Sequence, residues 1–68
     1  MATGKIKWFS SQKGYGFIVP DDGSKDVFVH ITAVNQAGLN TLREGQSLEY
    51  EIVSNKGKES AGNLKVSD

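Results

Sequence analysis

The chain has no cysteine, a single proline, a single tryptophan and a formal net charge of zero over 68 residues. Without cysteine there is neither a disulfide framework nor a thiolate metal site. No apolar run approaches the roughly 20 residues that a membrane-spanning helix requires. The first residues also lack the apolar segment of a secretory signal, so we expect a cytoplasmic protein.

The balanced charge counts against nucleic-acid binding when only the total is considered. The charges are unevenly placed, however, because Lys5, Lys7 and Lys13 all precede the first acidic residue, Asp21. A locally positive face on a neutral protein attracts phosphates, although long-range steering is weak. The alternative is that these lysines are simply solvated.

A chain of this length is expected to be one domain, residues 1–68, burying roughly 60% of its unfolded surface. The pattern predicts short strands separated by turns, with almost no helical periodicity. The expected strands are residues 5–9, 13–18, 26–30, 46–53 and 63–66, and Thr32 is the expected cap of a single helical turn over 32–37. Alternation places Ile6, Ile18, Leu48, Tyr50, Ile52, Leu64 and Val66 toward the core.

The stretch 13–18, Lys-Gly-Tyr-Gly-Phe-Ile, carries the strongest functional signal. In a strand, Tyr15 and Phe17 share one face while Ile18 points to the other. The stretch fits the start of the aromatic ribonucleoprotein signature, and departs from it at Pro20. Ordinary core aromatics are the alternative interpretation of the same pattern.

The returning strand, 26–30, adds Phe28 and His30 on the face opposite Val27 and Val29. If the two strands form a hairpin, four rings make one patch beside the N-terminal lysines. Exposed bases stack on rings and phosphates need cations, so such a patch suits single-stranded nucleic acid.

Trp8 is ambiguous at this level. Strict alternation buries it with Ile6, whereas a β-bulge turns it outward beside the lysines. The turn-rich segment 54–60 is expected to be a loop, and its Lys56 is a further candidate for phosphate contact.

Enzymatic function finds little support in the sequence. His30 has no partners at catalytic or zinc-ligand spacing, and the glycine pattern fits neither a dinucleotide-binding nor a phosphate-binding loop, so no cofactor and no metal are expected. An RNA recognition motif requires two amphipathic helices that are absent from the pattern. A small β-barrel that binds a peptide or protein through its aromatic face remains the alternative.

The order of four segments resembles the bacterial cold shock protein family over the whole chain. These segments are residues 4–9 (GKIKWF), 13–18 (KGYGFI), 26–30 (DVFVH) and 44–46 (EGQ). The resemblance implies an all-β, five-stranded antiparallel barrel of the oligonucleotide-binding (OB) type. It also implies a monomer that binds single-stranded RNA and DNA and acts as an RNA chaperone in cold adaptation. The family's binding positions fall on Lys7, Trp8, Phe9, Lys13, Tyr15, Phe17, Phe28 and His30, and the neighbouring Lys5 is a further phosphate-contact candidate.

The chain departs from the family pattern at two positions where the family commonly has aromatic residues. It has Ile31 after the histidine and Leu39 in the following loop. Both are candidate binding positions that lack a ring, so we expect affinity and footprint to differ while the fold and the ligand class are retained.

Overall fold

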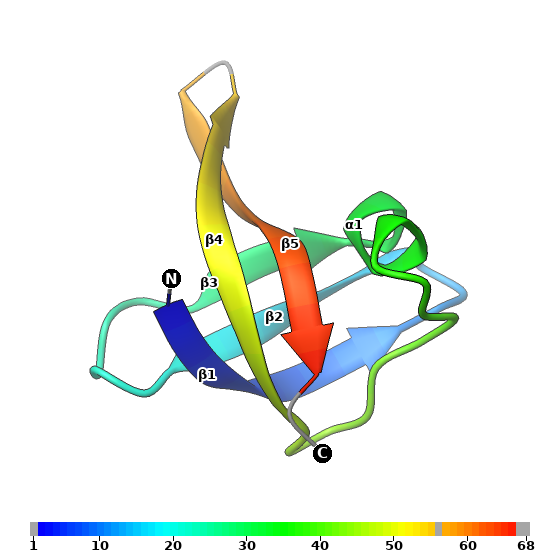
Figure 1. Ribbon diagram of the computed structural model, residues 1–68, viewed down its shortest axis with the longest axis horizontal. Coiled ribbons are helices and arrows are strands. Elements are labelled where there is room, and N and C mark those ends of the chain that lie inside the picture. The colour runs from blue at the N-terminus through cyan, green and yellow to red at the C-terminus, as the bar shows by residue number, and fades with distance from the viewer. Residues whose placement is uncertain (1, 56, 67–68) are drawn as a thin grey trace.

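The computed structural model describes residues 2–55 and 57–66, which form five strands and one short helix (Figure 1). The elements are β1 (Ala2–Ser10), β2 (Tyr15–Pro20), β3 (Val27–His30), α1 (Ile31–Gln36), β4 (Ser47–Asn55) and β5 (Lys58–Val66). They close into a barrel in the order β1-β2-β3-β5-β4. The predicted all-β, five-stranded OB-type barrel is confirmed, with one junction, β3 against β5, that is parallel rather than antiparallel.

Alternation of apolar residues produces the core, as the sequence predicts. Ile6, Ile18, Val29 and Tyr50 point into the barrel from four strands and are at most 2% exposed. The other buried residues are Val34, Leu42, Leu48, Ala61 and Leu64. Leu42 and Val34 come from the segment between β3 and β4, where no strand or long helix indicates an inward face.

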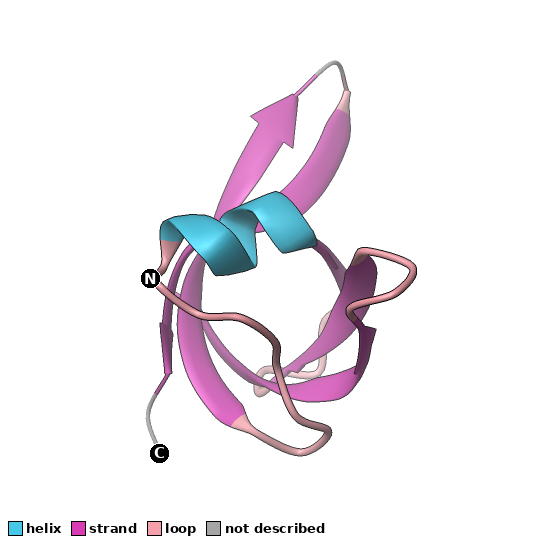
Figure 2. Ribbon diagram, turned by 90° about the vertical axis from the view of Figure 1, so that its right-hand side faces the viewer, coloured by secondary structure: helices cyan, strands magenta, loops and turns pink. Residues whose placement is uncertain are grey.

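The helix α1 lies across one end of the barrel (Figure 2) and buries Val34 against the core. The expected cap at Thr32 is wrong, since the helix begins at Ile31 and its cap is His30. The His30 ring instead accepts a hydrogen bond from the Thr32 backbone N–H at 3.2 Å. Among the described residues, no helix has the length and apolar character needed to cross a membrane.

The strands β4 and β5 continue beyond the barrel as a two-stranded hairpin (Figure 1). The expected loop over residues 54–60 is therefore wrong for most of its length, because β4 ends at Asn55 and β5 begins at Lys58. Ile52 was expected in the core, but it lies past the end of the closed barrel and is 44% exposed. Cross-strand pairing extended this hairpin where the turn-residue composition predicted a loop.

Candidate nucleic-acid interface

A β-bulge in β1 determines where Trp8 points. Ile6 is opposite Ile18 and Trp8 is opposite Phe17, so two steps along β1 match one step along β2 and Lys7 is the additional residue. A bulge of this kind changes the face on which the following residues lie. Trp8 therefore joins the outer face of β2, which resolves the ambiguity of the sequence pattern.

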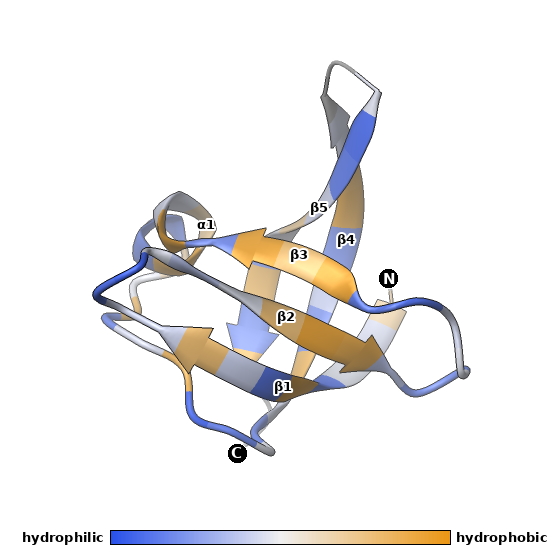
Figure 3. Ribbon diagram, turned by 180° about the vertical axis from the view of Figure 1, so that it is seen from behind, coloured by the Kyte–Doolittle hydropathy of each residue, from blue (hydrophilic) through white to orange (hydrophobic). Residues whose placement is uncertain are grey.

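Five rings gather on the outer face of β1, β2 and β3. We call Trp8, Tyr15, Phe17, Phe28 and His30 the aromatic patch. The register places Tyr15 opposite His30 and Phe17 opposite Phe28. Figure 3 looks onto the three strands that carry the patch, which lie side by side.

The rings of the aromatic patch form a continuous chain of contacts. Trp8 lies 5.5 Å from Tyr15 and 5.4 Å from Phe17, centroid to centroid. Phe28 stacks on Tyr15 at 5.7 Å with 27° between planes, and His30 follows Phe28 at 6.2 Å. These separations are the usual range for interacting aromatic pairs, so the rings support one another's orientation. Four of them are half-buried and His30 is exposed, which leaves ring surface open to a ligand.

The hydrogen bonding of His30 fixes its tautomer when the ring is neutral. Its Nδ1 accepts the Thr32 backbone N–H and lies 3.1 Å from Thr32 Oγ1. Because Nδ1 accepts, the ring proton is on Nε2. His30 thus has a structural role as the cap of α1 in addition to its place in the aromatic patch.

Phe9 does not belong to the aromatic patch. It is opposite Gly16, and its ring packs against the core. A Cβ added to Gly16 would lie 2.7 Å from Phe9 Cδ1 and would also meet the Trp8 carbonyl oxygen. Glycine is therefore required at position 16 so that β1 can approach with Phe9 inside and Trp8 outside.

The three N-terminal lysines are all exposed, and two of them flank the aromatic patch along the chain. Lys7 protrudes at the bulge, and Lys13 lies in the turn before β2. Lys5 lies on the outer side of β1, opposite Val19. Lys7 Nζ is 3.0 Å from Asp26 Oδ2, so part of its charge is already compensated.

Ile31 and Leu39 are not brought into the aromatic patch. Both are half-buried and pack against the core. The Ile31 N–H donates to the Gly14 carbonyl at 2.8 Å, which places Ile31 next to the turn before β2. Lys56 lies outside the described residues.

A groove beside Phe28 was not identified from the sequence. It has a volume of about 590 Å³ and is lined by Phe28, Lys58, Glu59 and Ser60. It forms where β3 meets β5, with Phe28 opposite Ser60. This parallel pairing joins residues 28 and 60, which are 32 positions apart, and no local pattern predicts it. The only sequence feature that pointed to this groove was the expected lysine-containing loop over residues 54–60.

The arrangement is suited to holding an unpaired strand of nucleic acid. Ring faces offer stacking that any base can use, and the exposed ammonium groups offer contacts to phosphates. The described residues contain no cluster of metal-ligating side chains.

Comparison with known proteins gives consistent matches. Residues 2–67 match the model of the "'Cold-shock' DNA-binding domain" family. The chain is 60% identical to the probable cold shock protein y4cH of Sinorhizobium fredii and 54% identical to the cold shock protein CspA of Rhizobium meliloti, in both cases over 97% of this chain and 99% of the relative. It is 52% identical to the cold shock-like protein CspE of Escherichia coli, over 90% of this chain and 88% of the relative.

Proposed function

Because the chain belongs to the cold-shock DNA-binding domain family, a family of nucleic-acid-binding proteins that are not enzymes, we propose that it binds single-stranded RNA and DNA across the aromatic patch. The observation that carries this proposal is the continuous group of five rings on the outer face of three strands. Folding does not require large aromatic groups outside the barrel. A ligand with flat apolar faces accounts for them.

In the proposed complex, bases leave their stacks and lie on Trp8, Phe17, Phe28 and His30, with Tyr15 as a further ring. Lys5, Lys7 and Lys13 contact the phosphates. Stacking accepts every base, so sequence preference is modest and favours flexible pyrimidine runs. No residue of the patch is assigned to a 2′-hydroxyl, so RNA and DNA are both ligands.

The proposed cellular role is that of an RNA chaperone. A bound strand cannot pair with its complement, so binding competes with weak secondary structure and melts it by mass action. We propose that residues 1–68 act as one cold shock domain, monomeric and cytoplasmic, in cold adaptation and in the regulation of transcription and translation. The cold shock names of the relatives support the first of these roles.

Trp8 provides the direct test, because it is the only tryptophan and lies inside the patch. Titration with a heptamer of thymidine or uridine should change its fluorescence strongly and saturably. The matched control is the same sequence in a fully paired duplex, which hides the base faces and should bind far more weakly. Equal binding of duplex and single strand would contradict the proposal, as would binding that leaves Trp8 fluorescence unchanged.

A further inference from the structure

The β4–β5 hairpin has an unpaired backbone edge. β1 pairs with β4 only between Ser47 and Tyr50. Beyond Tyr50, no strand within residues 2–55 and 57–66 pairs with this edge of β4. Segment 51–55 contains no proline or lysine, and beyond the charge of Glu51 and the register shift at Glu49–Glu51 it carries no device that protects such edges. Its backbone N–H and C=O groups are therefore open to an added strand.

The side chains of this edge are also unusual for a solvated surface. Ile52 and Val53 are 44% and 42% exposed. β-branched residues fit a strand with neighbours on both sides. Here the neighbour on one side is missing among the described residues.

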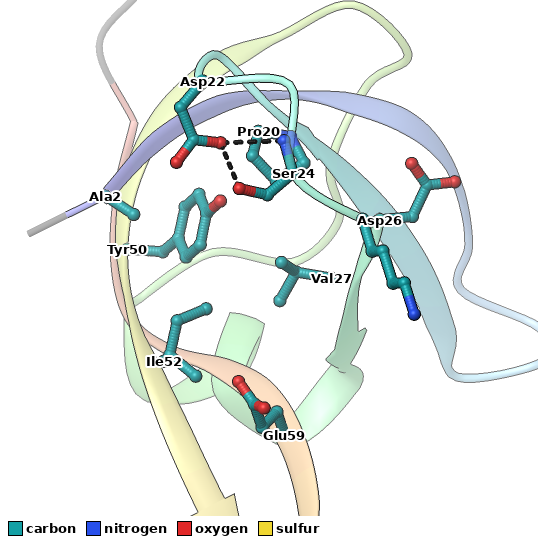
Figure 4. A pocket seen from close by; sticks show the side chains of 10 residues that line it. Ala2, Pro20, Asp22, Ser24, Asp26, Val27, Tyr50, Ile52 and Glu59 are labelled. Carbon is teal, nitrogen blue, oxygen red and sulfur yellow. Dashed lines mark hydrogen bonds between the residues drawn. The ribbon is translucent and has the colours of Figure 1, made fainter.

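A cavity of about 380 Å³ lies beside this edge, at the end of the barrel away from α1 (Figure 4). Its apolar walls include Val27, Tyr50 and Ile52. Asp22 and Glu59 approach it from opposite sides in Figure 4. Asp26 and Lys25 complete its charged groups, and Asp26 is already paired with Lys7.

Two carboxylates that lack an ion-pair partner among residues 2–55 and 57–66, those of Asp22 and Glu59, favour a cation in this cavity. Asp22 accepts hydrogen bonds from the Ser24 backbone N–H at 2.9 Å and from the Ser24 hydroxyl, and these bonds lower the pKa of Asp22 and keep it charged. Tyr50 is 1% exposed, and its hydroxyl points into the cavity without a hydrogen-bond partner among the described residues. Burial, together with Asp22 and Asp21, raises the pKa of Tyr50, so the hydroxyl stays protonated.

We propose that the β4 edge binds an extended basic polypeptide segment as an added strand, with one lysine or arginine side chain of that segment in the cavity. Backbone hydrogen bonds to residues 51–55 provide the affinity, and the cavity provides specificity by selecting a basic side chain. The aliphatic stem lies along Ile52 and Val27. The cationic group lies toward Glu59, and Asp22 adds negative charge from the far side of the cavity.

Charge distinguishes this partner from a second copy of the chain. Self-pairing of the two β4 edges would leave the carboxylates of both cavities unmatched, because segment 51–55 carries no lysine or arginine. A basic segment supplies the missing cation.

The test uses a synthetic probe, a seven-residue peptide in which lysine alternates with valine and threonine, titrated into the ¹⁵N-labelled full chain. We expect saturable amide shifts in residues 51–55 and no shifts in the aromatic patch. A peptide with glutamate in place of lysine should produce none of these changes.

Matched variants separate the edge from general charge effects. Ile52→Lys puts a like charge on the edge and should weaken peptide binding by about tenfold or more. Val19→Lys is the control, because Val19 is 41% exposed but lies opposite Lys5 in paired strands. It should bind the peptide as the unmodified chain does. Glu59→Gln should weaken binding by about two- to fivefold, the effect of one exposed ion pair.

Three results would overturn the proposal: peptide shifts confined to the aromatic patch, an equal loss in the Ile52→Lys and Val19→Lys variants, or self-association through β4 without peptide shifts. The Trp8 response to a thymidine heptamer should be unchanged in the Ile52→Lys variant, since Ile52 lies in neither the aromatic patch nor the groove beside Phe28. Peptide binding and nucleic-acid binding can therefore fail independently.

Discussion

The two faces of β2 and β3 carry apolar side chains in opposite surroundings. Ile18 and Val29 are fully buried inside the barrel. Phe17 and Phe28, each one position earlier in its strand, lie half-exposed outside it. The inner face therefore stabilises the fold, whereas the outer face holds rings that folding leaves open. Because successive side chains of a strand point to opposite faces, the same two strands supply core residues on one face and exposed rings on the other.

The comparison is tested most strongly at Ile18. Ile18→Ala removes a fully buried side chain and should lower the free energy of unfolding by about 2 to 5 kcal/mol. Chemical denaturation measures it, with Val19→Ala as the exposed neighbour control, expected to change stability by about 0.5 kcal/mol or less. Similar losses at both positions would mean that the inner and outer faces are not distinct.

The outer face should show the reverse behaviour. Phe28→Ala should weaken binding to a single-stranded oligonucleotide by about 1 to 3 kcal/mol, because one stacking surface is lost. Its effect on the thermal midpoint should be small. Phe9→Ala is the matched control, since Phe9 packs on the core and its loss should act mainly on the midpoint. If Phe28→Ala instead unfolds the protein, and the fraction that remains folded still binds normally, Phe28 belongs to the core.

Ile31 lies at the boundary between the two faces and makes the comparison sharper. It is half-buried against the core, yet it directly follows His30 of the aromatic patch. We expect Ile31→Phe to tighten binding to a pyrimidine-rich strand by a fraction of the roughly 1 to 3 kcal/mol of a full stack. Affinity and thermal midpoint are measured on the same variant. Unchanged affinity with a midpoint lowered by overpacking would place Ile31 on the inner face.

The smallest expected effect concerns charge at the edge of the outer face. With three to five lysines on phosphates, log affinity should fall with log salt at a slope of about −2 to −3.5. Lys7→Gln should flatten the slope by about 0.7, the share of one phosphate contact on a single strand. Asp26→Asn is the counterpart, because it releases Lys7 from its ion pair and should raise affinity at low salt. A salt-independent affinity would favour a peptide ligand for the aromatic patch.

Local pattern predicted most of the barrel because alternation is a local property. Ile6, Ile18, Val29 and Tyr50 face inward as their spacing requires. Turn residues and apolar runs were enough to predict the order of the strands along the chain and the hairpin between β2 and β3. Four of the five rings of the aromatic patch were predicted on the same basis, and only Trp8 was left open.

The remaining features depend on contacts between distant segments. The direction of Trp8 follows from the register between β1 and β2, and no residue type specifies that register locally. Leu42 is buried although it lies in an irregular segment, because that segment packs Leu42 against the core of the barrel. The edge at residues 51–55 arises because β1 ends its pairing at Tyr50 while β4 continues.

The bulge at Lys7 makes the outer face depend on register rather than on strand length. Lys7 is the additional residue, so deleting it would leave Trp8 opposite Phe17 and Phe9 opposite Gly16, now in regular alternation from Ile6 onward. The damaging change is loss of the bulge with all residues kept, because a one-residue slip would turn Trp8 toward the core and Phe9 toward solvent. Such a slip would also bring Trp8 opposite Gly16, the position where a Cβ already meets β1. Removal of one particular codon is thus a milder change here than a substitution that lets the strand pair without its bulge.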